Sequence, residues 1–379
     1  MESRFWRFYV VEVLRALWLT LPITTIFYLN NFDFSQIGLA ESLLAFSVFL
    51  LEVPSGFISD KLGHKTIASS GYVVFGSALI LIGLSGNVFP LFLFGFLLWG
   101  ISEALISGAH HSLLYEHIKY LKGDFQKVYL ETSLLRSITV IFASLLGAFL
   151  YTIEPSLPFL IYGIVSISIA FFLISMKHSE RESDVSYHDI RRSLKKDLKR
   201  SGVLRVFLIG VVAFFIFQTM NVLILRPLVV ESGFSVLDLG WIMALLYGVS
   251  WLVPYFFKNK RLSELKIVSL FLPVSIAFIA LGFAGGIPFI FLLVVLRVFK
   301  DLIEKLAELL LQNRVSSSSR ASLLSVQSSL MNLGSSLSLF AFGLIIDVHG
   351  LSIAPMVLGV MSLVAFGAMV LTKLLNKHL

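Results

Sequence analysis

The sequence FSVFLLEVPSGFISDKLGHKTIASSGYVVFGSALILIGL, residues 46–84, joins two long apolar stretches through one short charged segment. The apolar stretches cover 35–58 and 66–84, and a helix rising ~1.5 Å per residue can cross ~30 Å of hydrocarbon with about 20 residues. Backbone amides in lipid must be satisfied internally, so a spanning segment is a helix or part of a closed barrel. The runs are continuous rather than alternating, which excludes barrel strands. This part of the chain therefore predicts two transmembrane helices joined by a turn outside the membrane.

The same pattern recurs along the whole chain. Hydrophobic residues make up 57% of the sequence and charged residues 14%, whereas a soluble domain carries about 25% charged residues. We predict an all-α integral membrane protein with twelve transmembrane helices. The expected spans are 6–28, 35–58, 66–84, 90–115, 128–151, 158–176, 203–229, 237–257, 266–284, 288–311, 321–346 and 352–372.

Lysine and arginine are segregated by the side of the predicted membrane. The alternate connections and the two ends contain 24 of the 30 basic residues. Six connections contain none: 29–36, 84–90, 152–158, 229–238, 284–288 and 347–352. Because basic loops stay in the cytoplasm, we expect a multi-pass protein of the cell membrane with both termini cytoplasmic. The net charge of +7 is explained by this topology, so we expect no nucleic-acid partner.

The longest polar segment divides the chain into two halves of six spans each. We expect an N-terminal bundle at 1–176, a cytoplasmic linker at 177–202 and a pseudo-symmetric C-terminal bundle at 203–379. Within the linker, apolar residues recur every four positions from Ile190 to Leu198 among basic residues. That spacing fits an amphipathic helix on the inner leaflet, and a solvated linker explains it equally well.

The most specific local motif is Gly-Phe-Ile-Ser-Asp-Lys-Leu-Gly-His-Lys at 56–65. It resembles the loop between helices 2 and 3 of the major facilitator superfamily, which reads G-x-x-x-D-(R/K)-x-G-(R/K)-(R/K). The positions that match are Gly56, Asp60, Lys61, Gly63 and Lys65. His64 replaces a usual base, and the glycines are expected to bracket a tight turn. Span count, orientation and the central linker extend the resemblance over the whole chain.

The resemblance implies a conformational latch. In the family, this loop holds the outward-open state, because its acid meets the amino-terminal end of helix 11. A carboxylate is favoured at a helix amino terminus, and here that terminus lies near Arg320. The alternative is that Asp60 and Lys61 only anchor a turn in water.

Two departures from the family pattern limit what the resemblance implies. The corresponding loop of the second half, 257–261, lacks both glycines and has Asn259 where Asp60 would fall, so any latch is one-sided. The fifth span contains no proline at 143–148, unlike the Gly-Pro-rich helix of the superfamily's drug/proton antiporters. Drug/proton antiport is therefore less well supported.

Ionisable residues inside the spans are the candidates for a substrate or proton site. A charged side chain is costly in lipid, so we expect each one to face the bundle interior or a water-filled cavity. The candidates are Glu12, Arg15, Glu103, Arg136, Arg297, Asp301 and Glu304. Glu12 and Arg15 are three residues apart on one helix and can pair.

The tenth span carries a charged stripe on one helical face, which includes Arg297, Asp301 and Glu304. We interpret this stripe as facing a cavity. The alternative is a set of intrahelical pairs, Arg297–Asp301 and Lys300–Glu304, that serve folding alone.

The two halves contain acids at matching positions. Glu103 lies thirteen residues after Pro90, and Asp301 lies thirteen residues after Pro288. In a two-repeat transporter, spans 4 and 10 are counterparts and the site lies near the midplane. We therefore expect both acids to face one central cavity.

These features predict a secondary active transporter of a small molecule that works by alternating access. Within this class, an exporter of amphiphilic compounds and a proton-coupled carrier both fit, and a proton-coupled exporter of amphiphilic compounds combines the two. A non-transporting membrane sensor or assembly partner and a membrane-embedded lipid enzyme are the alternatives. The sequence lacks a GxxxxGK[ST] loop, HExxH and GxSxG, and His110–His111 is a weak metal candidate because neighbours on a helix diverge. We expect no enzyme activity, cofactor or metal, and a monomer whose partners are its substrate, protons and the bilayer.

Overall fold

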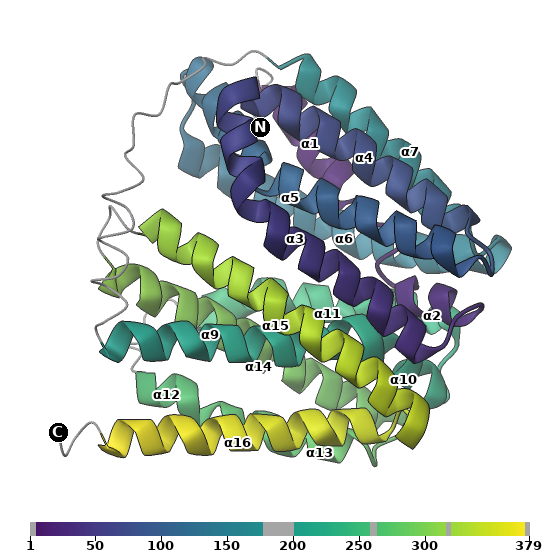
Figure 1. Cartoon of the computed structure of the whole chain (residues 1–379), viewed down its shortest axis with the longest axis vertical. Coiled ribbons are helices and arrows are strands. Elements are labelled where there is room, and N and C mark those ends of the chain that lie inside the picture. The colour runs from purple at the N-terminus through teal and green to yellow at the C-terminus, as the bar shows by residue number, and fades with distance from the viewer. Residues whose placement is uncertain (1–4, 177–200, 258–263, 316–319, 376–379) are drawn as a thin grey trace. The chain divides into compact units, whose positions relative to one another are not determined.

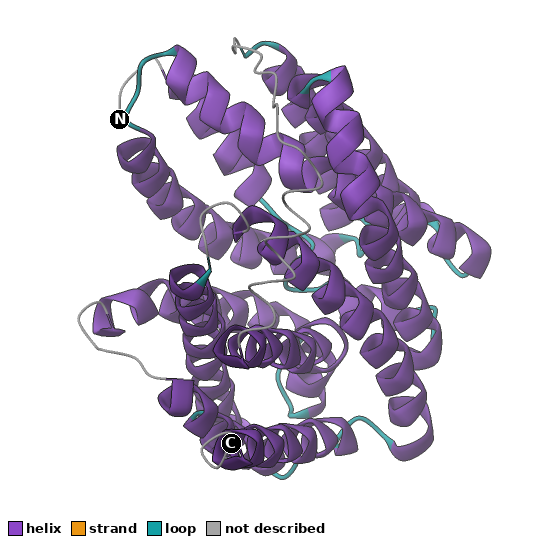
Figure 2. Ribbon diagram, turned by 60° about the vertical axis from the view of Figure 1, so that its left-hand side comes forward, coloured by secondary structure: helices purple, strands orange, loops and turns teal. Residues whose placement is uncertain are grey.

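The computed structural model describes residues 5–176, 201–257, 264–315 and 320–375, and the elements in these ranges are helices without any strand (Figure 1, Figure 2). The linker helix expected around 190–198 lies outside the described residues. The chain forms two compact units. Unit 1 is Met1–Asp184 with Ser235–Tyr247, and unit 2 is Val185–Phe234 with Gly248–Leu379.

Unit 1 contains the first six predicted spans. Its helices are α1 (Trp6–Ala16), α2 (Thr24–Leu29), α3 (Phe34–Leu62), α4 (His64–Leu84), α5 (Phe89–Tyr120), α6 (Phe125–Ile153) and α7 (Leu157–Ile174). Helix α4 packs against α5 and α7, α3 packs against α5, and α1 packs against α6. The first part of α11 (Val236–Phe257) belongs to this unit as well.

Unit 2 contains the remaining helices and the second part of α11. They are α9 (Ser201–Thr219), the π-helix η2 (Met220–Ile224), α10 (Leu225–Glu231), α12 (Glu264–Ser269), α13 (Phe271–Leu281), α14 (Gly286–Arg314), α15 (Arg320–His349) and α16 (Ile353–Leu375). Helix α13 packs against α14 and α16, and α9 packs against α15. These contacts repeat the pairs α4–α5, α4–α7 and α1–α6 of unit 1, as expected for two pseudo-symmetric bundles.

Ten of the described helical stretches are long and apolar enough to cross a membrane. The other two predicted spans are helical but differ in kind. The first is divided into α1 and α2, and the tenth is α14, whose charges distinguish it from an ordinary apolar span.

The first and seventh spans, predicted as continuous helices, are both interrupted. Residues 17–23 between α1 and α2 are not helical, with turns at 19–23, and η2 separates α9 from α10. A proline lies at or just beyond each interruption, at Pro22 and Pro227. Proline lacks an N–H and clashes with the carbonyl four residues earlier. That carbonyl belongs to Trp18 in one case and Leu223 in the other, and both fall within the interrupted segments.

Candidate functional site

The motif at 56–65 forms the joint between α3 and α4. Gly63 has a positive φ of 86° and is the single residue between the two helices, a conformation that glycine adopts without steric cost. Gly56 lies inside α3, so the expectation that both glycines bracket the turn is wrong for Gly56. The reason is that α3 continues through the charged residues to Leu62, and Asp60 and Lys61 are exposed on its last turn.

Side chains beyond this joint hold the ends of several unit 1 helices together. Lys65 Nζ donates a hydrogen bond to the carbonyl of Met176 at 3.1 Å. His64 Nδ1 lies 2.8 Å from Ser59 Oγ, and His64 Nε2 lies 3.8 Å from Glu116 Oε1. His64, the departure from the family motif, therefore connects the ends of α3, α4 and α5.

The expected partner of Asp60 lies in the other unit. Helix α15 begins at Arg320, as predicted for the eleventh span. Asp60 belongs to unit 1 and Arg320 to unit 2, so the latch between them stays a proposal.

A cluster of charged side chains surrounds Glu12 in the interior of unit 1. Glu12 Oε1 lies 3.0 Å from His110 Nε2 and 3.9 Å from Arg15 Nη1, and Glu12 Oε2 lies 3.5 Å from Arg136 Nη1. Glu12 is 3% exposed and His110 is 0% exposed. Helices α1, α5 and α6 thus bring together residues that are far apart in the sequence.

Tyr72 completes the hydrogen bonding of His110. Its hydroxyl lies 3.1 Å from His110 Nδ1. Ionised Glu12 only accepts hydrogen bonds, so His110 Nε2 carries a hydrogen, and the Tyr72 hydroxyl can donate to a bare Nδ1 or accept from a protonated one. The network therefore accommodates both the neutral and the cationic imidazole.

The interruption after α1 contributes to the same cluster. In a continuous helix, the N–H of Leu19 would bond the carbonyl of Arg15, but it bonds the carbonyl of Leu17 instead, at 2.8 Å. The Tyr162 hydroxyl donates to the carbonyl of Arg15 at 2.9 Å. A buried carbonyl needs a partner, so Tyr162 stabilises the end of α1 where Arg15 is presented.

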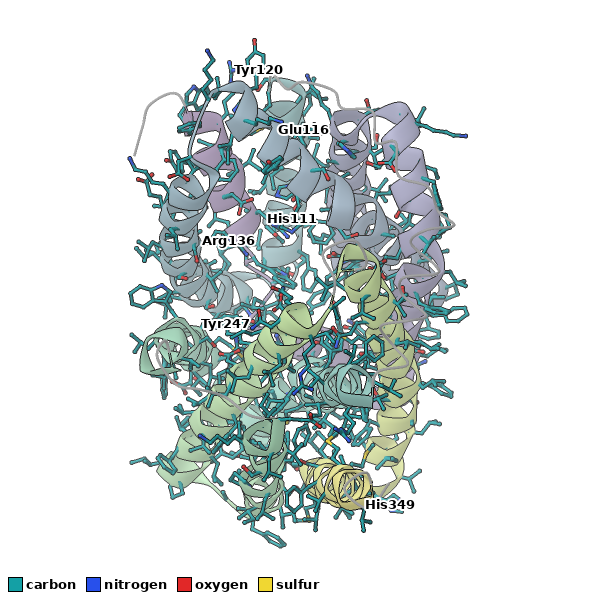
Figure 3. All side chains as sticks on the ribbon, turned by 90° about the vertical axis from the view of Figure 1, so that its left-hand side faces the viewer. His111, Glu116, Tyr120, Arg136, Tyr247 and His349 are labelled. Carbon is teal, nitrogen blue, oxygen red and sulfur yellow. The ribbon has the colours of Figure 1, made fainter. Side chains whose placement is uncertain are left out.

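Glu103 lies at the edge of this cluster. It accepts a hydrogen bond from Trp99 Nε1 at 3.3 Å and is within electrostatic range of Arg15. The Arg15 and Arg136 side chains are 33% and 39% exposed, so the cluster is reachable from outside the packed core. Figure 3 shows Tyr120 and Glu116 toward one end of unit 1, with His111 and Arg136 deeper inside it.

Unit 2 carries its own charged set along α14. Arg297 Nε lies 3.5 Å from Asp301 Oδ2, and Lys300 Nζ lies 2.7 Å from Glu304 Oε2. The intrahelical pairs considered from the sequence are therefore present. Arg297 Nε also donates to Ser250 Oγ of α11 at 2.5 Å.

Two oxygens of this set are left without a hydrogen bond among the described residues, Asp301 Oδ2 and Glu304 Oε1, and both atoms are buried. Asp301 itself is 6% exposed. A buried acceptor without a donor costs free energy, so these oxygens can accept hydrogen bonds from a bound molecule. Asp301 and Glu103 belong to different units, so their meeting in one cavity stays a prediction.

Sequence reasoning missed several members of these sets. His110 was considered only as a metal ligand, and Tyr72 and Tyr162 were not considered. Arg226 is 4% exposed, and its guanidinium donates to the carbonyl of Asn221 within η2. A polar side chain inside an apolar run was the available signal, but its partners lie on other helices. The described residues include no group of three His, Asp or Glu that could hold a metal.

Comparison with known proteins identifies relatives of this chain. The sequence profile of the Major Facilitator Superfamily matches residues 13–299. The Uncharacterized MFS-type transporter YxaM of Bacillus subtilis (strain 168) is 28% identical over 258 residues, which are 63% of this chain and 62% of the relative. An Uncharacterized transporter of Buchnera aphidicola subsp. Schizaphis graminum (strain Sg) is 26% identical over 268 residues, 66% of this chain and 63% of the relative. The match thus spans less than two thirds of each curated relative.

Solved transporter structures share the fold over nearly the whole chain. The nucleoside transporter NupG superposes with a TM-score of 0.80 at 16% identity, covering 97% of this chain and 98% of NupG. A D-xylose-proton symporter gives 0.72 at 15% identity, with 97% of each chain covered. The POT family transporter PepTSo gives 0.77 at 11% identity, covering 100% of this chain and 99% of PepTSo. These proteins are transporters rather than enzymes, in agreement with the expectation from the sequence.

Proposed function

Since the chain belongs to the Major Facilitator Superfamily, we propose that it is a secondary transporter that moves a small molecule across the cell membrane by alternating access. Its two six-helix bundles rock about a central site, as in two-repeat transporters. The finer proposal is export of amphiphilic cations in exchange for protons. The observation that carries it is the interior contact between Glu12 and His110, flanked by two arginines.

This contact suits proton coupling because Glu12 and His110 can each bind a proton, and they lie in a cluster where acidic and basic side chains are equal in number. With both carboxyl groups ionised, Glu12 and Glu103 balance Arg15 and Arg136, so the set is neutral while His110 is neutral. One proton added to Glu12 or His110 leaves a net positive charge inside the bundle. An interior positive charge repels a bound cation, so proton entry favours release of a cationic substrate.

The acids of unit 2 supply the substrate side of this proposal. Asp301 Oδ2 and Glu304 Oε1 have no hydrogen bond among the described residues, and an ammonium or amine N–H supplies the donor that each lacks. Arg297 Nε lies 3.5 Å from Asp301 Oδ2 itself, and Lys300 Nζ lies 2.7 Å from Oε2, the other carboxylate oxygen of Glu304. An apolar body carrying a basic nitrogen is therefore the substrate class that this wall fits.

The test is flux across a sealed bilayer. Purified protein is reconstituted into liposomes, and uptake of two lipophilic cations, ethidium and tetraphenylphosphonium, is measured with and without a pH gradient. We expect gradient-driven accumulation by the wild type and none by Asp301→Asn, with uncoupled exchange retained in Glu103→Gln. Glu154→Gln is the matched control, because Glu154 is exposed and lies outside both charged sets.

The same assay separates the alternatives, which the family assignment does not favour. A lipid enzyme changes a product without flux, and a sensor binds a ligand without flux. Accumulation that is the same with and without a pH gradient would contradict proton coupling and leave transport intact.

A further inference from the structure

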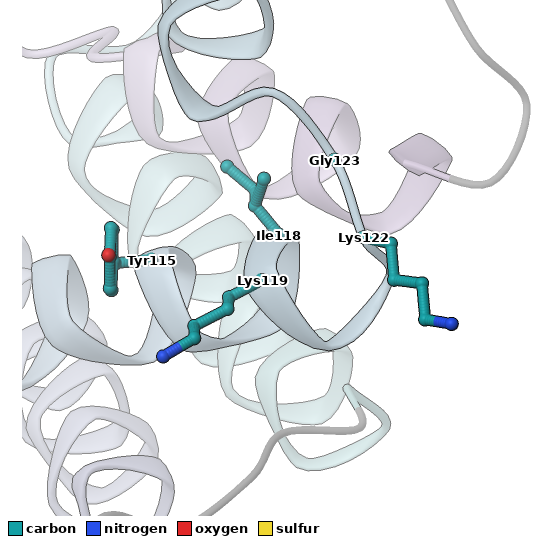
Figure 4. A pocket seen from close by; sticks show the side chains of 5 residues that line it. All are labelled: Tyr115, Ile118, Lys119, Lys122 and Gly123. Carbon is teal, nitrogen blue, oxygen red and sulfur yellow. The ribbon is translucent and has the colours of Figure 1, made fainter.

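A pocket of about 390 Å³ opens at the end of α5, away from both charged sets (Figure 4). Its lining residues are Tyr115, Ile118, Lys119, Lys122 and Gly123. The basic loop between α5 and α6 lies on the side predicted to be cytoplasmic. The anionic lipids of the inner leaflet lie on that side.

The end of α5 gives the pocket a fixed backbone. The N–H of Lys122 bonds the carbonyl of Lys119 at 3.0 Å, and the N–H of Gly123 bonds the carbonyl of Ile118 at 2.9 Å. Lys122 takes a left-handed conformation, with a φ of 53°. Hydrogen bonds of this kind end a helix with a defined turn, so the two lysines leave the same rigid turn.

Tight packing closes the floor of the pocket. Ile118 is 1% exposed, and so is Phe5, which precedes α1. A Cβ added at Gly123 would lie 2.4 Å from Phe5 Cζ. No side chain larger than glycine fits at position 123 without a shift of the Phe5 ring. The turn at the end of α5 is therefore packed directly against Phe5.

The open side of the pocket is basic and aromatic. Tyr115 is 46% exposed, and tyrosine is enriched at the depth of lipid head groups. Figure 4 shows Lys119 and Lys122 leaving the turn in different directions, with Tyr115 on the side of Lys119. Both lysines are exposed, and their long flexible stems allow either ammonium to turn toward a bound group.

Among the described residues, neither Lys119 nor Lys122 takes part in an ion pair. The acid nearest to Lys119 in the sequence is Glu116, whose Oε1 lies 3.8 Å from His64 Nε2. The acid nearest to Lys122 is Asp124, whose Oδ1 accepts the N–H of Lys127 at 3.3 Å. The positive charge of the pocket is therefore available to a ligand. We propose that this pocket binds a phosphate-bearing group, the phosphodiester of an anionic lipid head group, with Lys119 and Lys122 as its charge partners and Tyr115 beside the glycerol.

The test is native mass spectrometry of the full chain in detergent with equal amounts of phosphatidylglycerol and phosphatidylcholine. We expect the wild type to retain phosphatidylglycerol in preference. The Lys119→Gln/Lys122→Gln variant should lose that preference by about fivefold for each lysine, the usual size for one basic residue near an anionic surface. Lys127→Gln/Lys266→Gln is the matched control, since both residues are exposed basic residues on the predicted cytoplasmic side outside the pocket.

A second measurement identifies the source of the phosphate. Glycerol phosphate at millimolar concentration should not displace the bound lipid if the site needs the acyl chains. Displacement would support the phosphate site and assign it to a soluble ligand. An equal loss of phosphatidylglycerol in both double variants, or equal retention of the two lipids by the wild type, would overturn the proposal.

Discussion

Glu12 of α1 and His110 of α5 are 98 positions apart in the sequence, yet Glu12 Oε1 lies 3.0 Å from His110 Nε2 in the interior of unit 1. Each is almost fully buried. An ionisable pair in a membrane interior is costly, so it is by default a candidate for a functional site. The account of proton coupling depends on this contact, and the predictions below test it and the fold around it.

The Tyr72 hydroxyl is expected to be required for both protonation states of His110. Tyr72→Phe removes the group that lies 3.1 Å from His110 Nδ1. Loss of one partner of a buried polar group costs about 1–3 kcal/mol, so thermal unfolding in detergent should shift to lower temperature. Ser77→Ala is a control, because the Ser77 hydroxyl only bonds the carbonyl of Val73 on its own helix. An unchanged Tm in Tyr72→Phe would show that water replaces the hydroxyl.

The interruption between α1 and α2 predicts a strict requirement for glycine in α6. A Cβ added at Gly147 would lie 1.9 Å from the carbonyl oxygen of Leu19. Overpacking of this kind costs typically about 1–3 kcal/mol, so Gly147→Ala should lower the Tm. At Gly108, in α5, nothing lies within 4 Å of an added Cβ. Gly108→Ala should therefore leave stability unchanged or raise it, and equal losses in both variants would contradict the close contact.

Much of the fold follows from the sequence alone. A run of about 20 apolar residues is a local property of the sequence, and so is the charge of the loop that follows it. The apolar runs therefore predicted the spans, and all twelve predicted spans correspond to helices. The interruptions at Pro22 and at η2 were missed because proline in a membrane helix is tolerated when neighbours satisfy the freed carbonyls. The contact between Tyr162 and the Arg15 carbonyl depends on how α7 packs against α1. The sequence of α1 alone therefore cannot predict it.

The candidate site was predicted in part for the same reason. Glu12, Arg15 and the pairs of α14 are close in sequence or share a helical face, so periodicity identifies them. His110 and Tyr72 join Glu12 from α5 and α4, and no pattern within either helix indicates that contact. The meeting of Glu103 with Asp301 depends on how the two bundles pack, and it remains a prediction.

Topology can be tested with single cysteines, because the chain has none. Cysteines at Asn30, Asn87, Ser232 and His349 should react with an impermeant maleimide added to intact cells. Asn87 is preferred to its neighbour Ser85, which is only 2% exposed. A cysteine at Thr66, exposed on the predicted cytoplasmic side, should react only after the cells are opened. Labelling of just one half from outside would contradict the twelve-helix topology.

The latch proposal is tested by Asp60→Asn, which removes the charge and keeps the shape. A charge at a helix terminus contributes on the order of 1 kcal/mol or less when exposed, so the variant should shift the population toward the inward-facing state by a few-fold. Double electron–electron resonance between labels at Thr66 and Asn313 would report the change in distance. An unaltered distance distribution would mean that Asp60 only anchors its turn.

The most direct test of the central claim measures protons and substrate together. Pyranine trapped in proteoliposomes reports the internal pH while tetraphenylphosphonium flux is followed, in wild type, Glu12→Gln and Glu154→Gln. The account predicts that wild type and Glu154→Gln move protons in exchange for the cation, whereas Glu12→Gln exchanges the cation without moving protons. Proton movement in Glu12→Gln with the wild-type stoichiometry would contradict the assignment of coupling to the Glu12–His110 contact.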